Sequence, residues 1–414
     1  MHRVILPGQA MGKHGSVVDL QTTHPHFVEH CLQTPLLIVG MVADPVVADL
    51  MLSRKRRRLP TVYEISDDFQ SFPTSLPGCG FYQHPKTQAL IQALAQQADL
   101  LQFSSHQLHH KYQHLNKNTA VFMNQLADIV PLNHRKETGE ASPILGWGGS
   151  IGHTEDAKQL AHYLKTWVKQ RSGCYPVKPH LHLMAADSLV AIFQQTGLQI
   201  THRPPGTFDD YLDFLTRIHI GFAMVGGDDF SQGRSDGKFL EYASRGVICL
   251  ASRQGPYQQS IQHGQQGFLF SNQTEFNDVL ETVYTDAALR QKVRQTAHHL
   301  ISQQRTHAIA ATQRLATYSP LATGQANALK PLLSAGFQSM IDPTESLMLR
   351  ATQRHAQNQL EDALQDYVLV LEKHPGYYLP WQRGATVAKA MGSKENAVFF
   401  ETTGQKILQQ LLAV

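Results

Sequence analysis

The strongest constraint on the fold is a regular alternation of short apolar runs with longer stretches of helical periodicity. In the first third of the chain, strands are expected at residues 4–6, 36–41, 62–65, 99–103 and 121–123. Helices are expected between them at 45–53 and 87–101. Short apolar strands that alternate with helices are typical of parallel α/β units. The sequence therefore predicts an α/β domain over this region.

A second series of the same kind follows a polar segment at 133–143, which contains Gly139 and Pro143 and is expected to be a linker. A helix is expected at 154–170. Strands are expected at 144–147, 180–184, 198–202, 218–224, 247–251 and 267–270. Two α/β halves joined by a linker leave a cleft between them, and ligands bind at the carboxyl ends of parallel strands. The fold class predicted is therefore α/β, with two domains facing across a cleft.

The last seventy or so residues have a different, helical pattern. Four residues fall at the spacing of the second helix of a tetratricopeptide unit, and Ala397 follows the first of them by the repeat period of 34 residues. These four are Ala363, Tyr367, Val370 and Pro375. Two such units cannot bury a solenoid core alone, so we expect one or two helical hairpins packed on the main body. The domain limits predicted are 1–135, 141–335 and 341–414.

Composition excludes several classes of protein. The formal charge is only +3, from 36 basic and 33 acidic residues, which does not indicate nucleic-acid binding. Four scattered cysteines without a CxxC pair exclude a zinc ribbon and a disulfide scaffold, and they fit a reducing compartment. The 23 histidines lack ligand spacing, so no metal site is expected. No apolar run approaches the ~18 residues of a membrane span, and the amino terminus does not resemble a signal peptide, so a cytoplasmic location is expected.

One candidate for chemistry is the stretch 233–257, in which a polar loop opens a helix. Arg234 and Ser235 precede the helix, and Lys238 and Glu241 share one of its faces. Free N–H groups and cations at a helix amino terminus suit a diphosphate, and a carboxylate one turn later suits ribose hydroxyls. The alternative is a surface ion pair beside a solvated loop.

A second candidate is the glycine-rich loop at 146–153, between an expected strand and an expected helix. Gly149 and Ser150 would expose backbone N–H groups toward a phosphate. The loop lacks the Gly-Lys-Ser/Thr end of a Walker motif and the glycine spacing of the dinucleotide fingerprint. The alternative is an ordinary tight turn. Asp67 and Asp68 follow the strand at 62–65, where they either face the cleft or form a turn.

Taken together, these segments resemble the group-1, family-4-like glycosyltransferases of the GT-B type, and most closely a bacterial subgroup of them. The subgroup has a G-W-x-G-S-x-x-H loop, a segment ending K-S-x-x-K-x-x-E-Y, a downstream G-P-Y and a V-Y-E-I-D-D-D stretch. The matching residues lie at 146–153, 229–242, 255–257 and 62–68. The resemblance covers roughly residues 36–300. It implies two Rossmann-like domains, with the donor on the second and the acceptor on the first.

The resemblance also implies a role for each matching residue. Catalytic roles fall to Lys238, Arg234 and Asp68. Binding of the nucleotide sugar falls to Gly149, Ser150, His153, Arg203, Ser235, Glu241 and Tyr242. Glu241 would bind the ribose, the cations would neutralise the diphosphate, and the strand end at Arg203 would lie beside the base. No cofactor and no metal are implied beyond a UDP-, GDP- or similar sugar donor.

The function implied is transfer of a sugar from a nucleotide-diphosphate donor to a hydroxyl of a glycan, a lipid-linked acceptor or a protein, with retention and without a metal. The chain departs from the family at Gly233, where the first of two glutamates is expected, and at Ser150 and Asp156, where cations are usual. The alternative is therefore a non-catalytic relative that binds a protein partner through 341–414. Membrane contact is expected to be peripheral at most, at the inner face, with the basic run 54–58 either meeting anionic lipid or ending a solvated helix.

Overall fold

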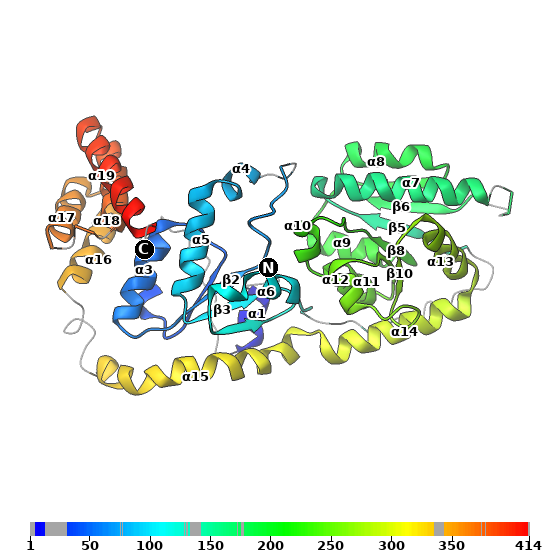
Figure 1. Cartoon of the computed structure of the whole chain (residues 1–414), viewed down its shortest axis with the longest axis horizontal. Helices are drawn as coiled ribbons and strands as arrows, with labels where there is room; N and C mark the ends of the chain where they lie inside the picture. Colours follow the sequence, from blue (N-terminus) through cyan, green and yellow to red (C-terminus); the bar gives the residue numbers. More distant parts are fainter. Residues whose placement is uncertain are drawn as a thin grey trace.

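The computed structural model describes residues 5–12, 31–74, 76, 78–127, 129, 131–132, 142–171, 173–174, 178–334, 343–373, 375–376 and 378–412. Two sheets, each made of parallel strands, lie side by side (Figure 1). Two long helices run beneath them (Figure 1). A group of helices from the end of the chain packs on the outer side of the first sheet (Figure 1). The predicted α/β class with a helical extension is confirmed.

The first sheet has four parallel strands in sequence order. They are β1 (Leu37–Gly40), β2 (Thr61–Ile65), β3 (Leu100–Phe103) and β4 (Thr119–Val121). The helices of this domain are α3 (Pro45–Arg56), α4 (Cys79–Tyr82), α5 (Pro85–Gln97), α6 (His106–Tyr112) and the 3-10 turn η2 (Gln113–Leu115). Side chains alternate across β2: Tyr63 and Ile65 enter the core beneath α3 and α5, and Val62 enters a smaller core on the opposite face.

The strand expected at 4–6 is wrong at residues 5 and 6, which belong to helix α1 (Ile5–Ala10), and residue 4 lies outside the described residues. A short apolar run before Pro7 fits either a strand or the first turn of a helix, so periodicity alone does not distinguish them. In the structure α1 packs against the long helix α15 (His307–Ser334), and Met11 joins the small core around Val62. Tertiary packing therefore decides in favour of the helix.

The second sheet has six parallel strands in the order β10-β9-β8-β5-β6-β7. They are β5 (Leu145–Gly148), β6 (His180–Met184), β7 (Gln199–Arg203), β8 (Ile220–Ala223), β9 (Ile248–Ser252) and β10 (Phe268–Phe270). The chain runs outward from β5 to β7, then returns to β8 on the other side of β5 and runs outward again. The strand order reverses between β5 and β8, and in open α/β sheets such a reversal opens a crevice at the carboxyl ends of the strands.

Helices cover both faces of this second sheet. They are η3 (Ile151–His153), α7 (Thr154–Gln170), α8 (Asp187–Phe193), η4 (Gln194–Thr196), α9 (Phe208–Leu215), α10 (Asp229–Gly233), α11 (Gly237–Ser244), α12 (Gly255–Ser260), α13 (Gln273–Thr285) and α14 (Ala287–Gln304). Trp147 and Trp167 are fully buried on the α7 face, and Tyr242 is fully buried on the α11 face. Two apolar cores therefore hold the sheet rigid behind the crevice.

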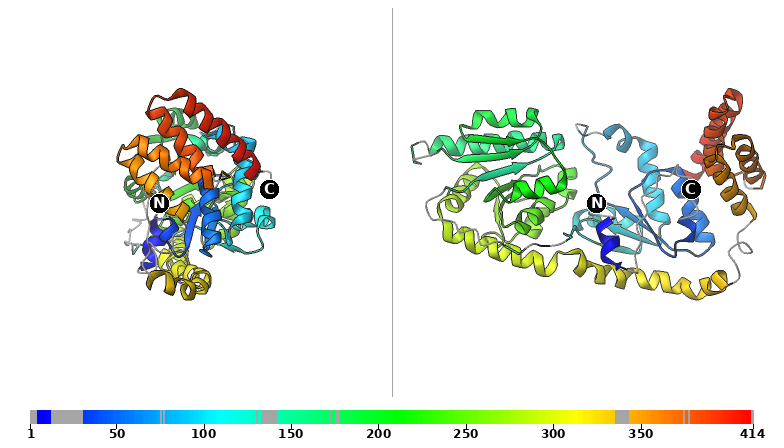
Figure 2. Two further views of the ribbon diagram at one scale, coloured as in Figure 1. Left: turned by 90° about the vertical axis from the view of Figure 1, so that its left-hand side faces the viewer. Right: turned by 180° about the vertical axis from the view of Figure 1, so that it is seen from behind.

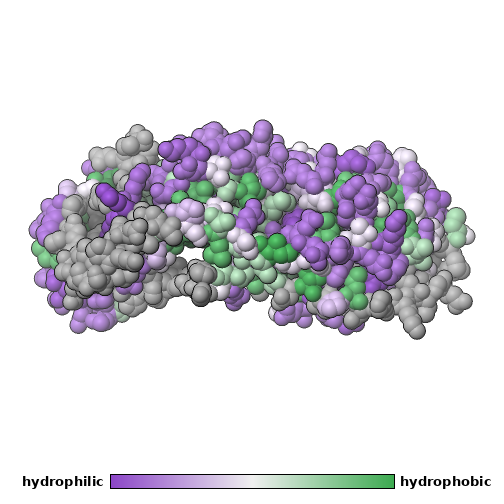
Figure 3. All heavy atoms as spheres, turned by 90° about the horizontal axis from the view of Figure 1, so that it is seen from below, coloured by the Kyte–Doolittle hydropathy of each residue, from purple (hydrophilic) through white to green (hydrophobic). Residues whose placement is uncertain are grey.

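Helix α15 returns beneath the first sheet, as the views from front and back both show (Figures 1 and 2). The Tyr318 hydroxyl donates to Gln102 Oε1 at 2.6 Å, and Gln102 in turn donates to the buried Glu64 of β2. Seen from below, the described part of this face is mainly hydrophilic, with apolar residues in small groups (Figure 3). Within the described segments, no helix is both long and apolar enough to cross a membrane.

The carboxyl-terminal region forms four helices that share one core with the first domain. They are α16 (Pro343–Ala356), α17 (Leu360–Lys373), α18 (Tyr378–Ala390) and α19 (Lys394–Leu412). Leu379 and Val387 of α18 belong to the same apolar cluster as Val47 of α3 and Ile91 of α5. The expectation of helical hairpins packed on the main body is confirmed, and their tetratricopeptide character stays a prediction.

The basic run at 54–58 is not a uniform surface patch, because Arg54 is fully buried. Its guanidinium donates to the carbonyls of Thr34 at 2.9 Å and Pro60 at 2.6 Å, and to the Thr61 hydroxyl at 2.9 Å. Burial lowers the pKa of Arg54 to about 10. Arg54 therefore ties α3 to the loop before β2. This role differs from both sequence interpretations of the run, which were contact with anionic lipid and a solvated helix end.

Candidate functional site at the strand-order reversal

The two segments that the sequence singled out meet where the strand order reverses. The loop after β5 and the helix α11 come from opposite sides of the reversal, yet Lys238 Nζ donates to the carbonyl of Gly148 at 2.6 Å. The same ammonium lies 5.0 Å from the centroid of the Trp147 ring. Lys238 therefore points toward the glycine-rich loop at the carboxyl end of β5, and not into bulk solvent.

Glycines in the loop permit this close packing. A Cβ on Gly148 would lie 2.8 Å from the Tyr211 ring, and one on Gly149 would lie 2.5 Å from the Trp147 ring. Tyr211, on α9, packs over Gly148, and its hydroxyl lies near enough to Glu241 to lower the pKa of that carboxyl in part. Nothing in the sequence pattern indicated Tyr211, because its contact with Glu241 depends on the tertiary position of α9.

Glu241 and Lys238 both have strongly shifted pKa values. Burial raises the pKa of Glu241 to about 7, against the opposing influence of Lys238 and of the Tyr211 hydrogen bond. Burial lowers the pKa of Lys238 to about 8. A cluster of groups with such shifted pKa values is a candidate functional site.

The raised pKa of Glu241 makes stability depend on pH in a defined window. The folded protein holds this proton more tightly than the unfolded chain does, so the benefit is complete below about pH 4.5 and is lost as the pH rises through about 7. Allowing for partial exposure, we expect the unfolding free energy of the wild type to fall by about 1–3 kcal/mol relative to Glu241→Gln between pH 4.5 and 8. Denaturant titrations across this range measure the difference, and parallel curves for the two proteins would contradict the assignment.

A second group of charges lies beside the amino terminus of α7. His153 Nδ1 lies 2.8 Å from Asp156 Oδ2, and the Arg234 guanidinium lies 3.4 Å from both ring nitrogens of His153. Arg234 Nη1 is also 3.9 Å from Asp156. Burial, together with the nearby Lys238 charge, lowers the pKa of His153 to about 4. Positive charge at the site therefore comes from Arg234 and Lys238, and Asp156 offsets part of it.

A buried ion pair fixes the loop that leads into α11. Asp236 is almost fully buried, accepts from the Ser260 hydroxyl at 2.6 Å and pairs with Arg305 at 2.8 Å. Arg305 also donates to the carbonyl of Asn124 at 3.0 Å, so the loop is tied to the segment that follows β4. Sequence reasoning assigned no role to Asp236 beyond its place in the loop.

Removing Asp236 leaves the largely buried Arg305 guanidinium without its carboxylate. We expect Asp236→Ala to lower the unfolding free energy by roughly 3 kcal/mol, the lower end of the range for breaking a buried pair. The matched control is Asp213→Ala, which breaks exposed ion pairs with Arg203 and Arg217 and should change stability far less. Denaturant titration measures the unfolding free energy of both variants. Equal losses would show that the buried Asp236–Arg305 pair stabilises the fold no more than an exposed ion pair does.

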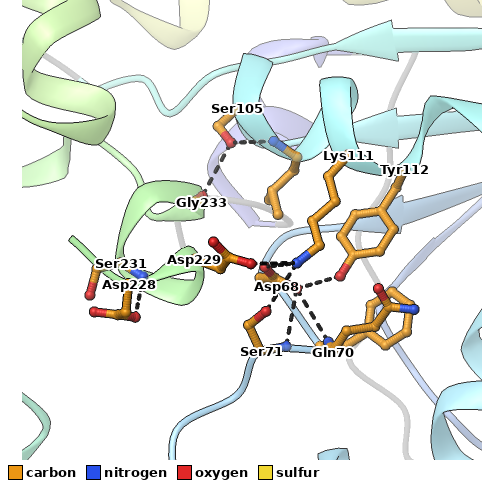
Figure 4. Close-up of polar contacts among 12 residues, drawn as sticks. Asp68, Gln70, Ser71, Ser105, Lys111, Tyr112, Asp228, Asp229, Ser231 and Gly233 are labelled. Carbon is orange, nitrogen blue, oxygen red and sulfur yellow. Dashed lines mark hydrogen bonds and ion pairs between the residues drawn. The ribbon is translucent and has the colours of Figure 1, made fainter. Parts of the chain in front are cut away.

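The structure places Asp68 in a saturated network within the first domain (Figure 4). Its carboxylate accepts from Lys111 at 2.7 Å, from the Tyr112 hydroxyl, and from the backbone N–H groups of Gln70 and Ser71 at 3.3 Å each. Asp68 is 2% exposed. Every partner of this carboxylate comes from its own domain, and Asp68 also lines a cavity between the two domains, so its catalytic role stays a prediction.

Tyr242 is likewise a core residue. It is fully buried, its hydroxyl donates to the carbonyl of Phe222 at 3.0 Å, and its ring packs where a Cβ on Gly221 would lie at 2.6 Å. The binding role expected for its side chain is therefore at odds with its position.

The other expected binding residues lie on loops and strand ends of the second domain, and their binding roles stay predictions. Gly149 and Ser150 precede the amino terminus of α7, and Ser235 precedes α11. Arg203 ends β7, where it pairs with Asp213 at 2.9 Å. It lies farther from the reversal than the other residues, because β6 separates β7 from β5.

Gly233, the main departure from the family pattern, lies where the two domains touch. Its carbonyl accepts from the Ser105 hydroxyl at 3.1 Å, and a Cβ there would lie 3.1 Å from Leu108. A side chain at this position would require Leu108 to move by a few tenths of an ångström. In the part of the chain that the structure describes, no group of three His, Cys, Asp or Glu residues is placed to hold a metal ion.

Comparison with known proteins gives the fold. No protein-family model and no curated protein sequence matches the chain. Among solved structures it is similar to Anabaena HepE in complex with UDP and glucose, with 16% identity and a TM-score of 0.52 over 71% of this chain and 80% of that one. It is also similar to S. aureus TarM, with 12% identity and a TM-score of 0.53 over 70% of this chain and 58% of TarM. The chain therefore has the GT-B fold, with a helical extension.

Proposed function

We propose that this protein transfers a sugar from a nucleotide-diphosphate donor to an acceptor hydroxyl. The observation that carries the proposal is the convergence of Arg234, Lys238 and Glu241 on the glycine-rich loop at the strand-order reversal. Two cations and the amino termini of α7 and α11 suit a diphosphate, and a carboxylate one turn into α11 suits a ribose. HepE, which has the same fold, was solved with UDP and glucose bound.

In the proposed reaction the bond between the anomeric carbon and the diphosphate breaks, and the acceptor oxygen forms a new bond to that carbon. The leaving diphosphate gains negative charge, which Lys238 and Arg234 are positioned to stabilise. The acceptor proton passes to the departing phosphate. We further propose that the reaction retains the anomeric configuration. It needs no metal ion in this proposal, because Lys238 and Arg234 supply the positive charge that a metal ion would otherwise provide.

A panel of nucleotides tests this proposal directly. A ligand at 100 times its Kd stabilises a protein by about 2.7 kcal/mol, which is readily seen as a shift in Tm. We expect one of UDP, GDP and ADP, and its sugar conjugates, to raise the Tm, and we expect Glu241→Ala to abolish the shift. Absence of any shift across the panel would contradict the proposal.

One observation favours a second candidate function, that of a non-catalytic relative. Asp156 lies 3.9 Å from Arg234 and brings negative charge to the place where a phosphate would bind. In such a protein the crevice would bind no nucleotide sugar, and the helical extension would bind a protein partner. The same panel separates the two candidates, because only the enzyme responds to a nucleotide sugar.

A further inference from the structure

The short helix α10 of the second domain touches the first domain at both of its ends and leads directly into Arg234. Asp229 and Gly233 are its first and last residues. The Asp229 carboxylate lies 3.6 Å from the ammonium of Lys111 on α6, and the Gly233 carbonyl accepts from the Ser105 hydroxyl at 3.1 Å (Figure 4). The first domain therefore contacts both ends of the helix that carries one of the two proposed diphosphate cations.

An aromatic contact with the first domain lies between these two ends. Phe230 is buried, and its ring forms an edge-to-face pair with the ring of Phe72, with the centroids 5.1 Å apart. Phe72 lies between β2 and α4 and is anchored there. Its ring stacks on Tyr82 at 4.6 Å, and its carbonyl accepts from the Gln83 side chain at 2.8 Å. Because edge-to-face pairs have a defined geometry, the position of Phe230 depends on that of Phe72.

The ring of Phe230 also supports the Arg234 guanidinium, whose central carbon lies 5.9 Å from the ring centroid. A cation at this distance is attracted to the face of an aromatic ring. The remaining contacts of Arg234 are long, 3.4 Å to both ring nitrogens of His153 and 3.9 Å to Asp156. Strong charge-assisted hydrogen bonds measure about 2.7–2.9 Å, so these two residues hold Arg234 only loosely. The Phe230 ring therefore contributes to the position of the guanidinium.

The other proposed diphosphate cation, Lys238, has no such link to the first domain. Its ammonium donates to the Gly148 carbonyl at 2.6 Å and lies 5.0 Å from the centroid of the Trp147 ring. Both of these partners belong to β5 of the second domain. The two cations therefore differ in how they are held. Lys238 is held within its own domain, whereas the contacts of Arg234 lead through Phe230 to the first domain.

We propose that Phe72 of the first domain is a positioning residue for Arg234 of the second domain, acting through the ring of Phe230. The inference rests on the proposed function only for the task of Arg234, which is to stabilise the charge of the departing diphosphate. When Phe72 is in contact with Phe230, both cations are in place. Without that contact Lys238 still holds the donor, but Arg234 is no longer positioned for cleavage of the bond to the sugar.

Chemical modification of Arg234 tests this contact without any substrate. Phenylglyoxal modifies accessible arginines, and peptide mass spectrometry on the full chain follows each arginine separately. We expect Phe72→Ala to raise the modification rate of Arg234 about threefold, because the guanidinium loses its support on the ring. The rate at the exposed Arg217 should not change. The matched control is Phe81→Ala, because Phe81 also contacts Tyr82, with ring centroids 5.2 Å apart, but is 50% exposed.

Two further variants separate the aromatic contact from general packing. Phe72→Tyr keeps the ring and should keep the wild-type modification rate of Arg234. Phe72→Leu keeps most of the apolar volume but not the ring, and it should give the same rise as Phe72→Ala even if the alanine variant does not fold. An unchanged rate at Arg234 in the leucine variant, or an equal rise in Phe81→Ala, overturns the proposal.

Kinetics with the nucleotide sugar that the panel selects test the positioning role itself. We expect Phe72→Leu to lower kcat about tenfold and to leave the donor KM within about twofold of the wild type, because Lys238 and Glu241 still hold the donor. Phe72→Tyr should retain the wild-type kcat. An unchanged kcat in Phe72→Leu, or a loss that falls on the donor KM alone, overturns the proposal. A wild type that binds no nucleotide instead refutes the proposed function, and the modification rates still decide whether Phe72 positions Arg234.

Discussion

Lys238→Ala is expected to reduce turnover by about 100- to 1,000-fold, which corresponds to the ~2.7–4 kcal/mol that one positioned group contributes to a developing anion. Its ammonium is held at the mouth of the glycine-rich loop by the Gly148 carbonyl, where the leaving diphosphate would form. Steady-state kinetics with the selected nucleotide sugar measures the effect. The loss should fall mainly on kcat, because the charge that Lys238 stabilises is greatest in the transition state.

The matched control for this variant is Lys158→Ala. Lys158 is an exposed lysine on α7 whose ammonium pairs with the exposed Glu155 at 2.7 Å. We expect its kinetics to stay within twofold of the wild type. Equal activity losses in the two variants would mean a general effect of charge, and a loss under about fivefold in Lys238→Ala would remove this residue from the mechanism.

Leu379→Ala is expected to lower the unfolding free energy by about 2–5 kcal/mol, the usual cost of a cavity in a packed core. Leu379 is 1% exposed and lies in the cluster that joins the helical extension to the first domain. The matched control is Leu369→Ala on α17, because that leucine is 40% exposed and its loss should change stability by less than about 0.5 kcal/mol. If both variants lowered the unfolding free energy equally and only slightly, the helical extension would contribute little to the core of the first domain.

The shared core also changes what truncation should do. The repeat-like sequence of 341–414 suggests a separable module whose loss would leave donor binding intact. In the structure its removal uncovers apolar residues of α3 and α5, so we expect the truncated chain to lose stability in the first domain. A truncated protein with an unchanged Tm would contradict the packing described here.

The hydrophobic periodicity of the sequence was enough to predict most strands of the two sheets. The strand at 180–184 and the helix at 154–170 lie where the sequence placed them, because long amphipathic stretches and buried runs carry strong local signals. The strand prediction at the start of the chain was wrong because a short apolar run has no hydrophobic period. Contact with α15, some 300 residues later in the chain, determines the structure of this segment. A contact between segments so far apart in the chain gives no signal in the local sequence.

The candidate site was only partly predictable, for a related reason. Glycine spacing and the pair of Lys238 and Glu241 identified the two segments that meet. Tyr211 and Arg305 reach them from elements with no motif of their own, so sequence reasoning missed both. Asp68 has the residue type and strand-end position of a catalytic acid, yet Lys111 and Tyr112 satisfy it within its own domain. Satisfaction of a buried carboxylate is a tertiary property, and a linear pattern does not contain it.

A structure of the protein with its preferred nucleotide diphosphate is the most direct test of the central claim. We expect the diphosphate to lie between Arg234 and Lys238 at the amino ends of α7 and α11, with the ribose hydroxyls within hydrogen-bonding distance of Glu241. A nucleotide bound elsewhere, or bound in the crevice with its phosphates turned away from these two cations, would contradict the account.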